Sequence, residues 1–235
     1  MNQELLIEQM FQMLVSGDRA MARRVSETAF ENGISAQEMT LDIYWPLLEN
    51  VYTMYRQDQI TQLAQQYATR TLSSLIAQAQ PHYEVKESRD RSICMFCGNS
   101  ELEDLSGRLV ADILESEGYN VRFGGGNINY DDILAEIHGR QPEVLLLFAS
   151  GPQDAPMIRQ MIDHIRSINA YPNMQIVVGG GIFNRAPGLA EEIGADLWAT
   201  DPTDLLNQLE NNEHVRADLS ERTVGRTRNE KVVAA

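Results

Sequence analysis

Apolar residues in the first third of the chain recur with the spacing of amphipathic helices. In the opening segment, Leu6, Met10 and Met13 fall on one side of a helix of 3.6 residues per turn. Similar stripes run from Arg19 to Asn32 and from Ile60 to Gln80. A further stripe lies between these two, so the pattern predicts four helices with short connections, which is typical of a bundle.

Local residue types mark where these helices begin and bend. Ser35 and Glu38 have the spacing of a capping box, so the third helix is expected to start there and to run to about Tyr55. Pro46 lies inside this segment and predicts a kink.

The second half of the chain alternates between short apolar runs and helical stretches. This alternation predicts a parallel, doubly wound α/β sheet. The expected strands are Ser92–Cys97, Asn120–Phe123, Val144–Ala149, Gln175–Val178 and Leu197–Ala199. The expected helices span about 103–117, 130–140, 154–169, 187–193 and 202–211, with Asn129 and Asp201 as N-caps.

The change of pattern divides the chain into four parts. A polar stretch, PHYEVKESRDR, separates the helical part from the alternating part and is expected to be a linker. The predicted parts are a helical cap at 1–80, a linker at 81–91, a sheet domain at 92–212 and a charged C-terminal tail at 213–235.

Small residues follow four of the five predicted strands. The ends are Cys97-Gly98-Asn99-Ser100, Gly124-Gly125-Gly126-Asn127, Ser150-Gly151 and Gly179-Gly180-Gly181. Carboxyl ends of parallel strands meet at one edge of the sheet, where ligands of such folds bind. Glycine permits a close approach of backbone and ligand, but it also serves tight turns, and the pattern alone leaves both interpretations open.

Composition limits the classes of function. The 235 residues carry a net charge of −15, which argues against direct binding to nucleic acid or to an anionic membrane. The chain begins without a signal-peptide pattern and has no apolar run long enough to span a membrane, so a cytoplasmic protein is expected. Cys94 and Cys97 do not form a disulfide framework, and no nucleophile–base pair or metal cluster is evident.

The stretch from Gly179 to Asp201, GGGIFNRAPGLAEEIGADLWATD, resembles the last part of cobalamin-binding domains. That family has a strand entering a glycine pair, then Phe-Asn, a Pro and an Ala-Asp pair. Residues 92–121 resemble its first strand and helix, and Gly17 to Leu75 is similar to the helical cap of corrinoid methyl carriers and cobalamin photoreceptor regulators. The resemblance spans about 14–212. It implies a four-helix bundle followed by a flavodoxin-like five-stranded sheet, in which the glycine pair lets the nucleotide tail of cobalamin bury itself.

The chain departs from this family at the residues that contact cobalt. The family's Asp-x-His-x-x-Gly motif aligns with Glu101, Glu103 and Ser106, so a glutamate stands in the place of the histidine. In the cap, photoreceptor regulators carry a Trp, an adjacent Glu-His pair and a Thr above the corrin. The positions in this chain are Tyr55, Gln65, Gln66 and Thr69. The candidate cofactor-binding residues are therefore Tyr55, Gln65, Gln66, Thr69, Glu103, Gly125, Ser150, Gly179, Gly180, Gly181, Phe183 and Asp201.

Two classes of function follow from the resemblance. The first, favoured by the missing histidine, is a non-enzymatic sensory protein that binds cobalamin without a protein histidine, or a bilin such as biliverdin. It would respond to light and act through a protein partner or its own oligomeric state. The alternative is a corrinoid methyl-carrier subunit of a methyltransferase system, or a scaffold that has lost its cofactor.

Overall fold

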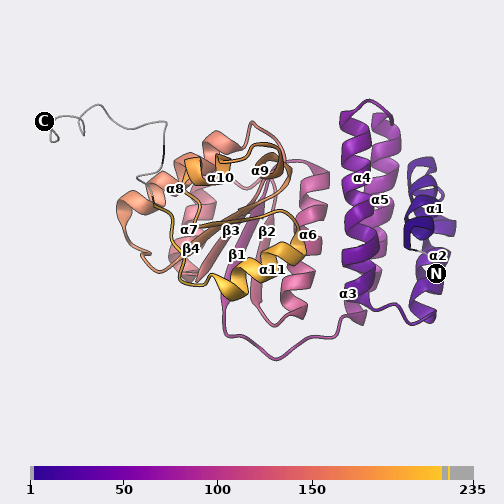
Figure 1. Ribbon diagram of the computed structural model, residues 1–235, viewed down its shortest axis with the longest axis horizontal. Coiled ribbons are helices and arrows are strands. Elements are labelled where there is room, and N and C mark those ends of the chain that lie inside the picture. The colour runs from indigo at the N-terminus through magenta and orange to yellow at the C-terminus, as the bar shows by residue number, and fades with distance from the viewer. Residues whose placement is uncertain (1–2, 219–221, 223–235) are drawn as a thin grey trace, which may run out of the picture. The chain divides into compact units, whose positions relative to one another are not determined.

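The computed structural model describes residues 3–218 and Arg222. Its N-terminal part is helical, and Figure 1 shows helices α4 and α5 side by side. The helical elements are α1 (Gln3–Ser16), α2 (Arg19–Glu31), α3 (Ala36–Glu38), η1 (Met39–Tyr44), α4 (Trp45–Arg56), α5 (Gln62–Ala79) and η2 (Gln80–His82). Because α3, η1 and α4 follow one another without a break, the predicted helical cap is confirmed.

A π-helical stretch accommodates the proline in the third helix. The ring nitrogen of Pro46 has no hydrogen to donate, so in an α-helix it would leave the Asp42 carbonyl without its usual partner. The η1 turn precedes Pro46, and Nε2 of Gln3 donates to the Asp42 carbonyl oxygen over 2.9 Å. The expected kink is therefore a change of helix type that α1 helps to stabilise.

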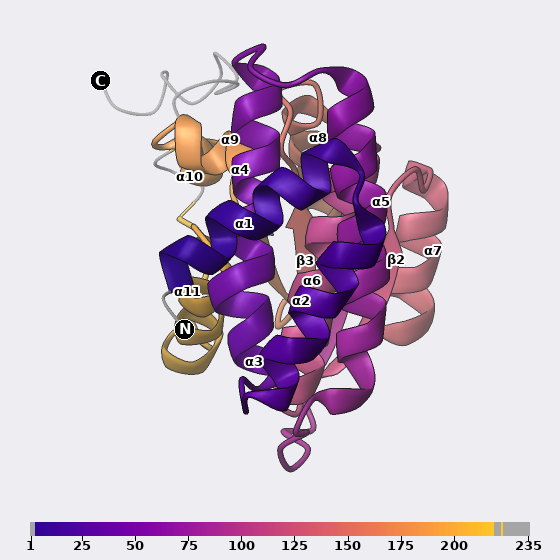
Figure 2. The same cartoon turned by 90° about the vertical axis from the view of Figure 1, so that its right-hand side faces the viewer.

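The predicted apolar stripes form the core of this helical part. Figure 2 shows α1 and α2 lying across the pair of helices α4 and α5. Leu6, Met10 and Leu14 of α1 are buried, as are Leu72 and Leu75 of α5. Helix packing around these side chains provides most of the stabilisation of the bundle.

The sheet has five strands in the order β2-β1-β3-β4-β5. The pairs β1–β3, β3–β4 and β4–β5 are parallel, which confirms the doubly wound, flavodoxin-like prediction. The strands are β1 (Ser92–Cys97), β2 (Asn120–Gly125), β3 (Val144–Phe148), β4 (Gln175–Gly179) and β5 (Leu197–Ala199). The helices are α6 (Glu101–Ser116), α7 (Tyr130–Arg140), α8 (Ala155–Ile168), α9 (Gly181–Arg185), α10 (Leu189–Ile193) and α11 (Pro202–Asn211), of which α9 was not predicted.

Contacts divide the chain into two compact units. We call Met1–Asp90 with Asn99–Gly126 the helical unit, and Arg91–Gly98 with Asn127–Ala235 the sheet unit. Helix α6 falls in the helical unit, where it contacts α4 and α5 on one side and β2 on another. Whether the predicted boundary at 81–91 separates two functional domains stays a prediction.

The predicted linker is held against the turn between α6 and β2. The backbone N–H groups of Lys86 and Arg89 donate to the carbonyl oxygens of Ser116 and Gly118, each over 2.8 Å. Nζ of Lys86 lies 2.6 Å from a carboxylate oxygen of Glu117. The segment is thus anchored along one edge of the helical unit.

The first residues after α11 are also anchored, in the sheet unit. Nε2 of Gln175 donates to the carbonyl oxygens of Asn212 and Val215, and the N–H of Ala217 donates to Asp196. The predicted tail therefore begins with an ordered contact to β4, and apart from Arg222 its remainder beyond residue 218 lies outside the described residues.

A buried carboxylate lies on α6. The side chain of Asp112 is 6% exposed, and Nε2 of Gln80 donates to its Oδ1 over 3.2 Å. Its Oδ2 has no hydrogen-bond partner among the described residues. Burial, together with the nearby Glu115 charge, raises the pKa of Asp112 from 3.8 to about 6, although Arg108 opposes the shift. The folded protein therefore favours the protonated acid.

Replacing Asp112 by asparagine is expected to stabilise the protein at neutral pH. Because the folded pKa is raised, the favourable contribution of the protonated acid is complete below pH 3.8 and is lost as the pH rises to about 6. At pH 7.5 we expect Asp112→Asn to gain about 1–3 kcal/mol of unfolding free energy. Urea denaturation of both proteins from pH 4 to pH 7.5 measures the difference, and a difference that does not change with pH would contradict this account.

Candidate functional site

The carboxyl ends of β1, β3 and β4 are joined by backbone hydrogen bonds. The N–H of Gly98 donates to the Phe148 carbonyl oxygen over 3.0 Å, and the N–H of Ala149 donates to the Gly179 carbonyl oxygen over 2.9 Å. In this strand order the direction of winding reverses between β1 and β3, which is where ligands of the fold class bind. We call the strand ends and the loops that follow β3 and β4 the rim.

The three glycines after β4 have different reasons to be glycine. Gly180 has φ +99°, and an added Cβ would lie 2.9 Å from the Ala149 carbonyl carbon and closer still to its oxygen. Gly180 is therefore required by the contact between two loops. At Gly179 an added Cβ would make ordinary contacts, 3.5 Å from the Phe148 ring and 3.7 Å from the Ala199 carbonyl oxygen.

Side chains cover the rim at two other glycines. An added Cβ at Gly181 would lie 2.5 Å from Nη1 of Arg185, and the three nearest atoms all belong to this arginine. Nη2 of Arg185 donates to the carbonyl oxygen of the half-buried Ser150. At Gly151 the three nearest atoms all belong to the side-chain amide of Gln153. Both covering residues are exposed, and it is the ends of their long side chains, not backbone, that lie over the two glycines.

Glu103 is part of a capping box at the start of α6. Its Oε2 accepts hydrogen bonds from Oγ of Ser100 over 2.8 Å and from the Ser100 N–H over 3.2 Å. The N–H of Glu103 in turn donates to Oγ of Ser100 over 3.1 Å. The side chain is 4% exposed. The residue in the position of the expected histidine therefore stabilises a helix end.

Gly125, which precedes the loop after β2, contacts the same helix. It has φ +74°, and an added Cβ would lie 2.6 Å from Oδ1 of Asp104. That oxygen also accepts a hydrogen bond from the Gly126 N–H over 3.3 Å. These contacts account for glycine at this position within the helical unit.

Phe183 and Asp201 have structural contacts in the sheet unit. Phe183 is 2% exposed and belongs to the apolar core under β3 and β4. Asp201 is the N-cap of α11, where its Oδ1 accepts from the Asp204 N–H over 2.9 Å. Both side chains thus have structural contacts of their own, and their contact with a ligand stays a prediction.

The four candidates in the cap lie on two neighbouring helices. Tyr55 is on α4, and Gln65, Gln66 and Thr69 are on α5. The first three are partly exposed. Thr69 is buried, and its hydroxyl donates to the Gln65 carbonyl oxygen over 2.9 Å within its own helix. Tyr55, Gln65 and Gln66 thus keep side-chain surface that a ligand can contact.

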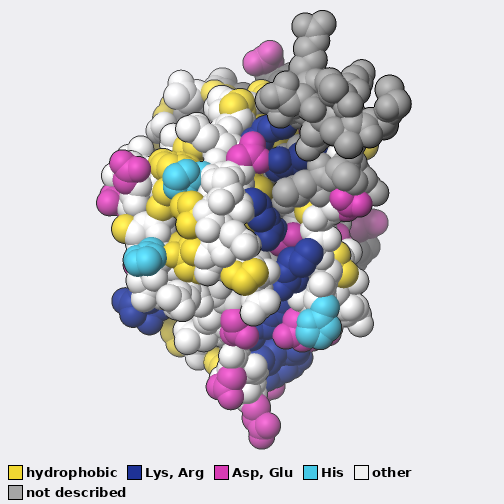
Figure 3. Space-filling view, turned by 90° about the vertical axis from the view of Figure 1, so that its left-hand side faces the viewer, with side chains coloured by type: hydrophobic (Ala, Val, Ile, Leu, Met, Phe, Trp, Pro, Cys, Tyr) yellow, Lys and Arg dark blue, Asp and Glu magenta, His cyan; other side chains and the backbone are white. Residues whose placement is uncertain are grey.

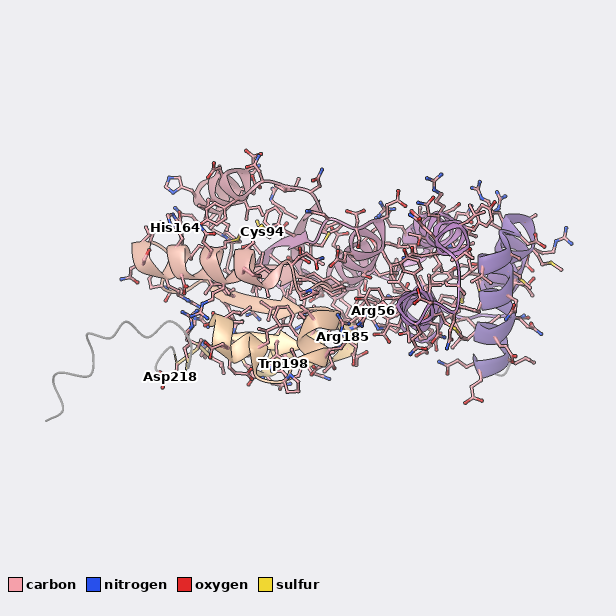
Figure 4. All side chains as sticks on the ribbon, turned by 90° about the horizontal axis from the view of Figure 1, so that it is seen from above. Arg56, Cys94, His164, Arg185, Trp198 and Asp218 are labelled. Carbon is pink, nitrogen blue, oxygen red and sulfur yellow. The ribbon has the colours of Figure 1, made fainter. Side chains whose placement is uncertain are left out.

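The histidines of the sheet-unit helices lie at a distance from the rim. Nδ1 of His138 lies 2.7 Å from the Tyr171 hydroxyl, and the ring of His164 packs edge-on against Tyr130. Figure 4 shows His164 and Arg185 at opposite ends of the sheet unit. In the helical unit, the His82 ring stacks on Phe30.

Within residues 3–218 and Arg222, no three histidine, cysteine or acidic residues come together as a metal site. Cys94 is buried and Cys97 is half-buried. The described helices include none with the length and apolarity of a membrane span.

Basic and acidic side chains adjoin each other on the surface. Figure 3 shows Lys and Arg side chains in a band with acidic side chains beside it. In the sheet unit, Nη1 of Arg159 lies 3.3 Å from Glu192, and Nη2 of Arg166 lies 2.6 Å from Asp196. The arginines of α8 are thus neutralised by local carboxylates.

Arg185 and Gln153 are the rim residues that the sequence did not identify. Arg185 ends α9, a helix of five residues that is too short to show an apolar period. Gln153 lies in the turn before α8. The sequence does hold one signal for Arg185, which is a basic residue four positions after the glycine triplet.

Two family models match the chain. The model described as the B12 binding domain matches residues 91–207, and a second model of the same description matches residues 6–80. No curated protein sequence matches the chain.

Solved structures match the chain at low sequence identity. The monomethylamine corrinoid protein of Methanosarcina barkeri has 16% identity and a TM-score of 0.75, over 89% of this chain and 98% of that one. A cobalamin-binding protein of Desulfitobacterium hafniense has 15% identity and a TM-score of 0.46, over 87% and 97%. The methanol:cobalamin methyltransferase complex of Methanosarcina barkeri has 14% identity and a TM-score of 0.48, over 92% and 82%. The likeness to the first of these structures concerns the fold alone.

Alanine at two adjacent rim glycines should have unequal effects. Gly180→Ala forces a Cβ against the Ala149 backbone at positive φ, so we expect a loss of about 2–4 kcal/mol of unfolding free energy. Gly179→Ala has room for its Cβ and should change stability by less than about 1 kcal/mol. Urea denaturation compares the two, and equal losses would refute the close approach at Gly180.

Proposed function

This chain belongs to the B12-binding family, with a helical domain ahead of the α/β domain, and we propose that it holds a corrinoid as the carrier component of a methyltransferase system. The observation that carries the proposal is the order and extent of the two matched domains, which together span nearly all of residues 6–207. The similar fold of a protein named as a corrinoid protein supports it.

The rim can take such a ligand if the side chains of Gln153 and Arg185 are displaced. Gly151 and Gly181 offer backbone that is covered by the ends of the Gln153 and Arg185 side chains. A ligand that displaces these two side chains gains a bare backbone surface at the switch point, without any movement of the strands. The buried Phe183 and the helix start at Asp201 keep that surface in place.

The protein residues point to a cofactor held without a histidine below cobalt. Glu103 is engaged with Ser100, and His138 and His164 contact tyrosines away from the rim. When bound, the corrinoid supplies a cobalt centre able to accept and donate a methyl group. The chain's own residues bind and orient it, and in this proposal the catalytic groups come from a methyltransferase partner.

The hypothesis of a light-responsive sensory protein has less support than that of a corrinoid carrier. Neither the family match nor the shared fold favours a response to light or a bilin ligand over a corrinoid. A carrier has to bind its cofactor and a protein partner. It does not also have to respond to light. We therefore retain biliverdin only as a comparison ligand.

Reconstitution tests the proposal directly. We expect the ligand-free protein to retain hydroxocobalamin through size-exclusion chromatography, with the visible spectrum of the cofactor eluting at the protein's volume and about one corrinoid per chain. Biliverdin should elute separately. Retention of biliverdin with loss of all cobalamin would overturn the carrier function, and failure to retain either would favour a scaffold without cofactor.

Helix α5 of the helical unit offers a matched pair of variants. Gln66 is partly exposed and aligns with the family's upper corrin contact, whereas Gln62, one turn earlier, is exposed. We expect Gln66→Ala to weaken cobalamin binding about three- to tenfold, through loss of a hydrogen bond. Gln62→Ala should bind as the parent does. Isothermal titration measures both, and equal affinities for all three proteins would remove Gln66 from the site.

A further inference from the structure

Arg185 differs from the other residues of the strand-to-helix connections in its charge. These connections are 98–100, 126–129, 149–154, 180–188 and 200–201, and Arg185 is their one lysine or arginine in the sequence. The connections also contain the acidic Asp154 and Asp201, and the whole chain carries −15. Within these connections, Arg185 is therefore the one basic residue that can attract an anion.

The position of Arg185 places its charge on the rim itself. Its guanidinium lies over Gly181 and donates to the Ser150 carbonyl oxygen, so it joins the loops after β3 and β4. The side chain is exposed, and only its far end lies over Gly181. A bound ligand must replace the contact with Ser150 by one of at least similar strength, which for a guanidinium is a phosphate or a carboxylate.

We propose that Arg185 is a specificity-determining residue that covers the rim in the ligand-free protein and pairs with the phosphate of the corrinoid nucleotide loop in the loaded one. This inference rests on the proposed corrinoid function. The corrin side chains of cobalamin end in neutral amides, and the phosphodiester is its one anionic group outside the corrin ring. Pairing with Arg185 therefore selects complete corrinoids over forms that lack the phosphate.

Three ligands separate the phosphate from the rest of the nucleotide loop. Cobalamin has phosphate and base, cobinamide phosphate has the phosphate alone, and cobinamide has neither. We expect Arg185→Gln to weaken binding of cobalamin and of cobinamide phosphate by at least about tenfold. Binding of cobinamide should be unchanged or slightly tighter, because the variant lacks the charged cover.

Two further variants serve as controls. Arg185→Lys should restore part of the lost affinity, and more so at low salt, since it keeps the charge without the planar fork. Gln153→Ala removes the neutral cover at Gly151 and should affect the three ligands equally. Isothermal titration at two salt concentrations measures all combinations.

The outcomes distinguish this inference from the proposed function. If the parent binds corrinoids but Arg185→Gln weakens all three ligands equally, the phosphate pairing is wrong and the carrier function stands. If Arg185→Gln weakens the binding of cobalamin alone, Arg185 contacts the base of the nucleotide loop. That result would also overturn the inference. If the parent binds none of the three, both proposals fail.

Discussion

Burial of α6 on both of its sides is the constraint on which the rest of the structure depends. Twelve of its sixteen residues are buried, so it is not an amphipathic helix with one free face. It contacts α4 and α5 as well as β2, and the segment from Lys86 to Arg89 is bound along its C-terminal turn. The helical cap is therefore packed onto an element of the α/β fold, and the place where α6 begins is fixed from several directions.

The fixed start of α6 decides what chemistry the site can offer. Ser100 and Glu103 form a reciprocal capping box at that start. Oδ1 of Asp104 accepts a hydrogen bond from the N–H of Gly126 in the turn after β2. A carboxylate with these contacts stabilises the start of the helix. The rim of the sheet unit differs, because the ends of two exposed side chains, Gln153 and Arg185, cover its glycines. In our proposal, a ligand exchanges these side-chain contacts while the backbone stays as it is.

Much of this fold was predictable from sequence, because its signals are local. The period of the apolar residues gave the four helices of the cap, and the bounds of β1, β5, α7 and α11 agree with the structure. The capping box at Ser35 and the N-caps at Asn129 and Asp201 are present as predicted. Their hydrogen bonds join residues three apart, which is why sequence spacing reveals them.

The site was less predictable, because its contacts join distant segments. Position 180 requires glycine because the Ala149 backbone, at the end of another strand, lies close to it. Arg185 likewise donates to the carbonyl oxygen of Ser150, which is 35 residues away in the sequence. The Ser100–Glu103 pair did have a local signature, but comparison with the cobalt-ligand motif drew attention to the missing histidine instead. Sequence indicated where the rim lies, and geometry was needed to say which side chains cover it.

The most direct measurement concerns the nitrogen bound to cobalt. The protein is prepared with nitrogen-15 in its histidines, loaded with cobalamin and reduced to the cobalt(II) form, and its electron paramagnetic resonance spectrum is compared with that of unlabelled protein. If no histidine of the chain coordinates cobalt, the hyperfine pattern is the same in both samples. A pattern that changes with the label would show a histidine ligand and contradict the account of Glu103 and the rim.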